Sequence, residues 1–70
     1  MEKIVHCYFI YSQKAYRFHG DHARTVSQAL NIETHYVQGI LACDVHDFCE
    51  AKEKLAKHGI FAKEMVNYGE

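Results

Sequence analysis

Apolar residues along the chain fall into short strand-like runs separated by two helix-like stripes. The run Ile4 to Tyr11 is β-branched and aromatic on both faces, which is typical of a central strand covered on two sides. After a polar break, Ala15 to His19 alternates, with its two aromatic residues on one face and Arg17 and His19 on the other. This alternation predicts an antiparallel partner strand with one wet face.

The middle of the chain predicts a short helix followed by a third strand. Asp21 is suited to cap a helix from His22 to about Leu30, and Asn31 to end it in the left-handed conformation. The strand then runs from about Thr34 to Cys43. Gly39 near its middle predicts either a bulge or a break into two short strands.

A second helix is predicted between Asp44, as N-cap, and Gly59, which ends it. A last strand follows from Ile60 to about Asn67. The helix turns an apolar stripe toward the core, formed by Val45, Phe48, Cys49, Leu55 and Ala56.

These elements predict an α+β two-layer sandwich. Its mostly antiparallel sheet has three or four strands in the order ββαβαβ, with two helices on one face. If Gly39 splits the third strand and the Ala15 to His19 strand fails to form, the order becomes the ferredoxin-like βαββαβ. Seventy residues with a 49% apolar content predict one small globular domain spanning residues 1–70, and they argue against disorder.

The formal net charge of −1 excludes a strongly basic nucleic-acid-binding domain, but the charge is unevenly distributed. Residues 1–30 carry four Lys and Arg against two Asp and Glu, whereas residues 31–70 carry four against seven. The chain has neither a span of about 20 apolar residues nor a signal-peptide pattern, so we expect a cytoplasmic protein. Its three cysteines are then expected to be free thiols.

Candidate chemistry is sparse. Cys43, His46 and Cys49 have the residue types and spacing of zinc ligands, but a second ligand pair is missing and Cys49 falls on the apolar stripe. His19 and His22 bracket a strand-to-helix turn and are interpreted as solvated. No phosphate loop or nucleophile motif occurs. We therefore expect no metal, no cofactor and no enzymatic activity.

Four acidic residues recur along the predicted second helix, namely Asp44, Asp47, Glu50 and Glu53. Such a row could meet a basic protein surface, including one that normally holds nucleic acid. We take it as the candidate partner-binding site. A solvated helix face accounts for the same pattern in part, since Glu50 precedes Lys54 by four residues.

The basic first half offers an alternative site. Aromatic and basic residues interleave in the predicted hairpin, so rings could stack on bases while cations meet phosphates. The residues of this nucleic-acid-binding alternative are Tyr11, Lys14, Tyr16, Arg17 and Arg24.

In size and composition, a compact proline-free α+β chain without catalytic groups resembles the small inhibitors that phages and mobile elements use against host nucleic-acid machinery, such as anti-CRISPR proteins. This resemblance involves no motif and assigns no residues. It implies a non-enzymatic protein-interaction module whose partner is a nucleic-acid-binding complex. The nine Tyr and Phe residues further predict a homodimer, and the alternative is a small nucleic-acid-binding regulator.

Overall fold

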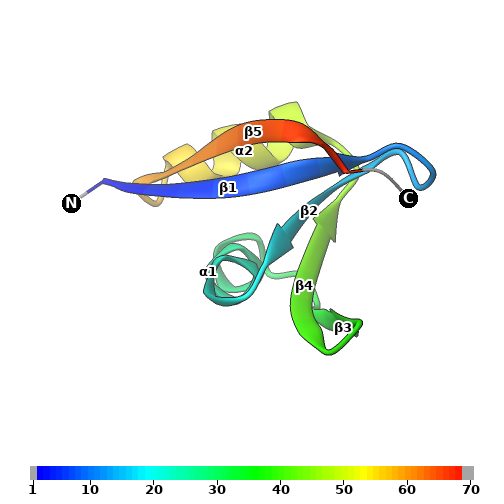
Figure 1. Cartoon of the computed structure of the whole chain (residues 1–70). Coiled ribbons are helices and arrows are strands. Elements are labelled where there is room, and N and C mark those ends of the chain that lie inside the picture. Colours follow the sequence, from blue (N-terminus) through cyan, green and yellow to red (C-terminus); the bar gives the residue numbers. More distant parts are fainter. Residues whose placement is uncertain (1, 69–70) are drawn as a thin grey trace.

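The computed structural model describes residues 2–68, which form five strands and two helices (Figure 1). In chain order these elements are β1 (Lys3–Ile10), β2 (Ala15–His19), α1 (Asp21–Leu30), β3 (His35–Val37), β4 (Ile40–Val45), α2 (Phe48–Ala56) and β5 (Ile60–Tyr68). The chain order is therefore ββαββαβ.

The strands form one mixed sheet in the order β3-β4-β2-β1-β5. Three of its pairings are antiparallel, and the pairing of β1 with β5 is parallel. The sheet twists strongly, so that β4 runs across the direction of β1 and β5 (Figure 1). The predicted α+β class is confirmed, but the sheet has one strand more than predicted.

The extra strand comes from the turn at Gly39. Gln38 and Gly39 both have positive φ, 53° and 82°, and Val37 lies opposite Ile40 across the turn. Two consecutive positive φ values are the signature of a type I′ hairpin turn, whose twist matches that of the flanking strands. Gly39 therefore breaks the predicted third strand in two, while the Ala15 to His19 strand also forms, so neither predicted order is correct.

The second helix begins later than predicted, because strand pairing places Asp44 in the sheet. Asp44 was expected to cap α2, but it lies in β4, opposite Arg17 of β2. The N-cap is Asp47, whose Oδ1 accepts a hydrogen bond of 3.0 Å from the Glu50 N–H. Local sequence carries this signal too, because Asp47 precedes Glu50 by the three residues of a capping box.

The first helix differs from expectation only at its start. Asp21 is the first residue of α1, and the N-cap is Gly20. Asn31 ends the helix in the left-handed conformation with φ 56° and ψ 49°, as predicted.

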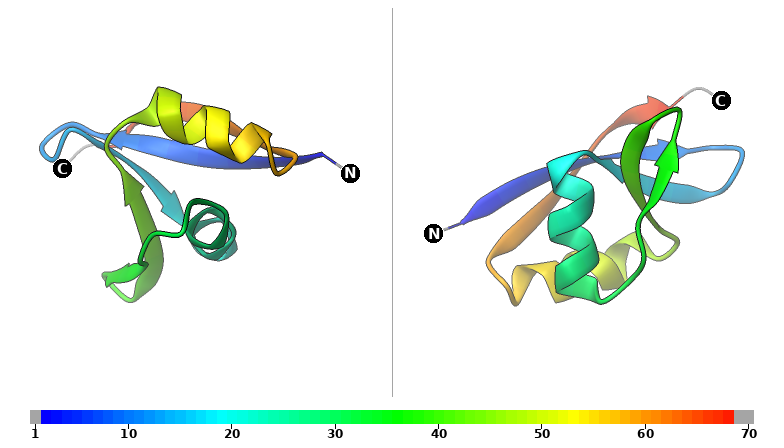
Figure 2. Two further views of the ribbon diagram at one scale, coloured as in Figure 1. Left: turned by 180° about the vertical axis from the view of Figure 1, so that it is seen from behind. Right: turned by 90° about the horizontal axis from the view of Figure 1, so that it is seen from below.

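Both helices pack on one face of the sheet (Figure 2). Phe18 and Leu55 are the largest fully buried side chains where sheet and helices meet, and Ala51 is buried beside them. The predicted apolar stripe is wrong at Cys49 and Ala56, which are exposed, because the stripe of α2 follows Phe48, Ala51 and Leu55 instead. In the described residues, neither helix has the length and apolar character needed to cross a lipid bilayer.

Burial predicts which thiol reacts. Desolvation raises the pKa of Cys7 to about 12 and that of Cys43 to about 11, whereas Cys49 is exposed. Since the thiolate is the reactive form, we expect a thiol-specific disulfide reagent at pH 8 to modify one cysteine rapidly in the native protein and all three in denaturant. The variant Cys49→Ser should lose the rapid phase. Two or three equally rapid equivalents in the native protein would contradict this packing.

Candidate interaction surfaces

The sheet face opposite the helices holds a buried ion pair between neighbouring strands. Arg17 on β2 donates from Nε to Oδ1 of Asp44 on β4 at 2.7 Å, and from Nη2 to Oδ2 at 3.2 Å. Gln13 accepts a further hydrogen bond from Nη2 at 3.1 Å. The Arg17 residue is only 2% exposed, so the expected wet face of β2 is wrong at this position. Two parallel donor–acceptor contacts are the strongest form of such a pair.

A histidine on the edge strand completes this network. His35 Nε2 on β3 lies 3.0 Å from Asp44 Oδ2. Burial alone would raise the pKa of Asp44, but the hydrogen bond and charge of Arg17, aided by His35, hold it below its ordinary value. Burial, with the charge of Arg17 beside it, lowers the pKa of His19 on the same face. Asp44 thus stays ionised.

The predicted acidic row is divided by the fold. The carboxylate of Asp44 is held on the opposite side of the sheet from α2. Asp47, Glu50 and Glu53 remain together at the exposed surface of α2 and its cap. Glu50 pairs with Lys54 at 2.9 Å, as the i,i+4 spacing predicts.

A groove of about 250 Å³ lies where the end of α1, the β4–α2 loop and α2 meet. Its apolar lining consists of Leu30, Ile32, Val45 and Ala51. Its polar lining includes Asp44, Asp47, Glu50 and Lys54, together with His46. Asp47 and Glu50 of the predicted acidic row therefore line this groove, and Glu53 does not. Asp44 contributes to the lining as well, but its carboxylate is turned to Arg17 and His35 on the other face of the sheet. We call this groove the helix-side groove.

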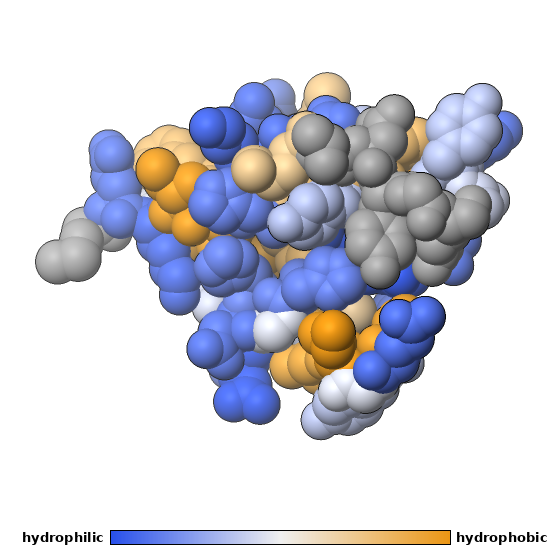
Figure 3. Space-filling model, viewed as in Figure 1, coloured by the Kyte–Doolittle hydropathy of each residue, from blue (hydrophilic) through white to orange (hydrophobic). Residues whose placement is uncertain are grey.

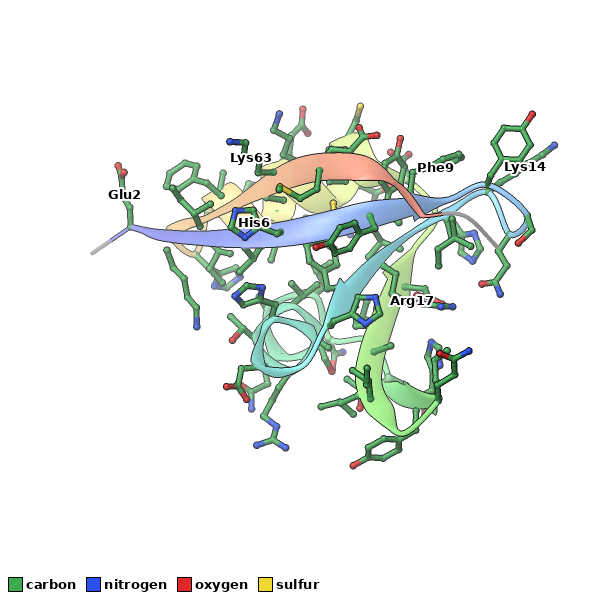
Figure 4. All side chains as sticks on the ribbon, in the orientation of Figure 1. Glu2, His6, Phe9, Lys14, Arg17 and Lys63 are labelled. Atoms are coloured by element: carbon green, nitrogen blue, oxygen red, sulfur yellow. The ribbon has the colours of Figure 1, made fainter. Side chains whose placement is uncertain are left out.

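The alternative nucleic-acid site is not assembled. Tyr16 turns toward the helices and stacks on Phe48, with ring centroids 4.5 Å apart. Arg17 is engaged by Asp44, as described above. Tyr11 and Lys14 are exposed in the β1–β2 turn, and Figure 4 shows Lys14 at the tip of this hairpin. Arg24 lies on α1, which is separated from that tip in Figure 1.

Sequence reasoning missed a different set of residues. Ile4 on β1 is 59% exposed, and Phe61 and Met65 on β5 are 41% and 44% exposed. Ile4 and Phe61 are register partners, and they lie on the sheet face that the helices leave uncovered. Figure 3 shows hydrophobic surface on this side of the molecule. The prediction that β1 is covered on two sides is therefore wrong at Ile4, whereas Ile10, farther along the same face, is fully buried. The sequence did not indicate this exposed face, because β1 has apolar residues on both faces and shows no clear alternation of polar and apolar positions.

The cysteine and histidine spacings do not converge on a metal site. Cys43 is buried in the core while His46 and Cys49 are exposed. His19 and His22 are half-buried rather than solvated. Within the residues that the structure describes, no group of three or more His, Cys, Asp or Glu side chains is placed to hold a metal ion.

Comparisons with protein-family models, curated proteins and solved structures find no match to this chain.

The ion pair predicts a specific pattern of stability. Asp44→Asn leaves the Arg17 charge buried without its counter-ion, so we expect the free energy of unfolding to fall by about 3–5 kcal/mol. The double variant Arg17→Met/Asp44→Leu removes both charges, so its free energy of unfolding should fall much less. Urea or thermal unfolding measures each value. Equal losses in the single and double variants would contradict the pairing.

The same pair predicts a dependence on pH. Because the folded pKa of Asp44 is depressed, its contribution is present above the ordinary carboxyl pKa of 3.8 and is lost as pH falls through the folded value. Below about pH 4, the free energy of unfolding of the native protein should therefore decrease relative to that of Arg17→Met/Asp44→Leu. A gap that is constant from pH 7 to pH 3 would contradict this account.

Proposed function

We propose that the protein is a non-enzymatic protein-interaction module whose helix-side groove holds a basic side chain of its partner. The observation that supports this proposal is the composition of the groove, whose lining combines apolar and acidic residues. Leu30, Ile32 and Ala51 are among the apolar residues, and Asp47 and Glu50 are acidic.

Lysine and arginine side chains match such a groove in chemistry. Each has an aliphatic stem that packs on apolar surface and a charged tip that seeks a carboxylate. Within the chain, Lys54 forms an ion pair with Glu50, but both side chains are more than half exposed. An exposed i,i+4 pair is worth only about 0.3–0.5 kcal/mol, so a partner's cation can displace Lys54.

The size of the groove favours binding of a partner's side chain over binding of a small-molecule metabolite. Its volume of about 250 Å³ lies below the roughly 300–1,000 Å³ of typical small-molecule sites. Protein surfaces that hold nucleic acid are rich in Lys and Arg. An acidic groove is complementary in charge to such a surface. This complementarity supports the proposal that the protein is an inhibitor that occupies its partner's nucleic-acid site.

Charge reversal inside and outside the groove tests the proposal. Glu50→Lys puts a cation in the lining of the groove, whereas Glu53→Lys makes the same change on the same helix outside the groove. We expect native protein to capture one stoichiometric protein from a lysate of its source cells. For the purified pair, calorimetry should show Glu50→Lys weakening affinity by about tenfold or more, roughly 1.4 kcal/mol, and Glu53→Lys by less than about twofold.

Circular dichroism should show both variants folded, since each site is exposed. The proposal fails if no stoichiometric partner is captured, or if the two reversals weaken binding equally. Equal effects would indicate long-range charge and not occupation of the groove.

A further inference from the structure

The uncovered face of the sheet gathers aromatic rings from neighbouring strands. Val5 and Cys7 of β1 point into the core, so the alternating residues His6 and Tyr8 lie on the opposite face. Phe61 on β5 shares that face, because Ile60 and Ala62 are buried on either side of it along the strand.

Two ring contacts involve residues of this face. The rings of His6 and His22, the latter on α1, are 6.0 Å apart between centroids. Those of Tyr8 and His19 are 5.9 Å apart and meet edge to face. Burial and the charge of Arg17 lower the pKa of His19, which favours the neutral form of its ring. Figure 4 shows His6 on the face turned toward the viewer. We call His6, Tyr8, His19 and Phe61 the ring strip.

Charge on this face favours an anionic ligand. Lys63 is exposed and is the register partner of His6. Among the strand residues described on this face, the one carboxylate is that of Asp44, and Arg17 and His35 already hold it. The ring strip therefore has a cation beside it and no unneutralised strand carboxylate.

We propose that the uncovered face binds single-stranded nucleic acid, with Tyr8 and Phe61 stacking on bases and Lys63 contacting a phosphate. Unpaired bases expose the faces that rings on an open sheet can stack against, whereas a duplex hides them. A duplex-binding protein needs many phosphate contacts, and this chain has a net charge of −1. The proposal uses a different surface from the helix-side groove and does not depend on it.

Fluorescence anisotropy with labelled oligouridylate and oligothymidylate tests this site. We expect binding at low salt, a shallow salt dependence equivalent to roughly one or two phosphate contacts, and weaker binding of a duplex of equal length. Phe61→Leu and Lys63→Gln together should weaken the affinity by about tenfold or more.

Two matched controls separate the strip from general effects. Tyr36→Leu removes an exposed ring on β3 whose register partner, Leu41, packs against the core, so this ring lies on the other sheet face. Lys57→Gln removes an exposed cation at the end of α2. Both should leave the affinity within about twofold, and Glu50→Lys should not weaken it.

Absence of binding at low salt would overturn the proposal, as would equal losses in the strip and control variants. Equal affinity for the duplex would also overturn it. If Phe61→Leu/Lys63→Gln leaves oligonucleotide affinity intact but abolishes capture of a protein, the face is a protein-binding surface and the proposal is wrong. Failure here leaves the groove untouched, because Glu50→Lys reports on the groove separately.

Discussion

The ion pair between Arg17 and Asp44 constrains both the fold and the surfaces of this protein. It joins β2 to β4 on the face that lacks helices, at a register where the neighbouring pair, Phe18 and Cys43, enters the core on the other face. A slip of one residue would expose Phe18 and bury a lone charge. Asp44 is thereby committed to the sheet, and α2 cannot begin before the chain has left β4.

The same pair redistributes the charge of the chain. Arg17 belongs to the basic first half and Asp44 to the acidic second half, so the two cancel in space although they lie 27 positions apart. What remains is divided between two surfaces. Carboxylates of Asp47 and Glu50 border the helix-side groove, while Lys63 accompanies the ring strip on the opposite side of the sheet. A net charge near zero therefore coexists with local surfaces of distinct chemistry.

Local patterns predicted those parts of the fold that depend on neighbours in sequence. The alternation in Ala15–His19, the left-handed Asn31 and the pairing of Glu50 with Lys54 each follow from short-range geometry. The start of α2 could not be decided in this way, because Asp44 and Asp47 both have capping character and strand pairing selects between them. The additional strand depends on whether Gly39 forms a bulge or a turn, which the pairing of Val37 with Ile40 decides.

The candidate surfaces were harder to predict for a related reason. The acidic row was found from spacing along one helix, yet the groove also needs Leu30 and Ile32, which come from another part of the chain. The ring strip depends on which face of β1 the helices cover, and β1 is apolar on both. Sequence identified the residue types, and tertiary packing decided which of them face solvent together.

Amide chemical-shift titration of isotope-labelled protein tests most directly whether the two surfaces are separate. With an arginine-rich peptide, we expect shifts at Ile32, Asp47 and Glu50 and none at His6 or Lys63. With oligothymidylate, we expect shifts at His6, Tyr8 and Lys63, and the two ligands should bind the same molecule simultaneously. Shifts in the same residues with both ligands, or competition between them, would show that the two surfaces are not separate.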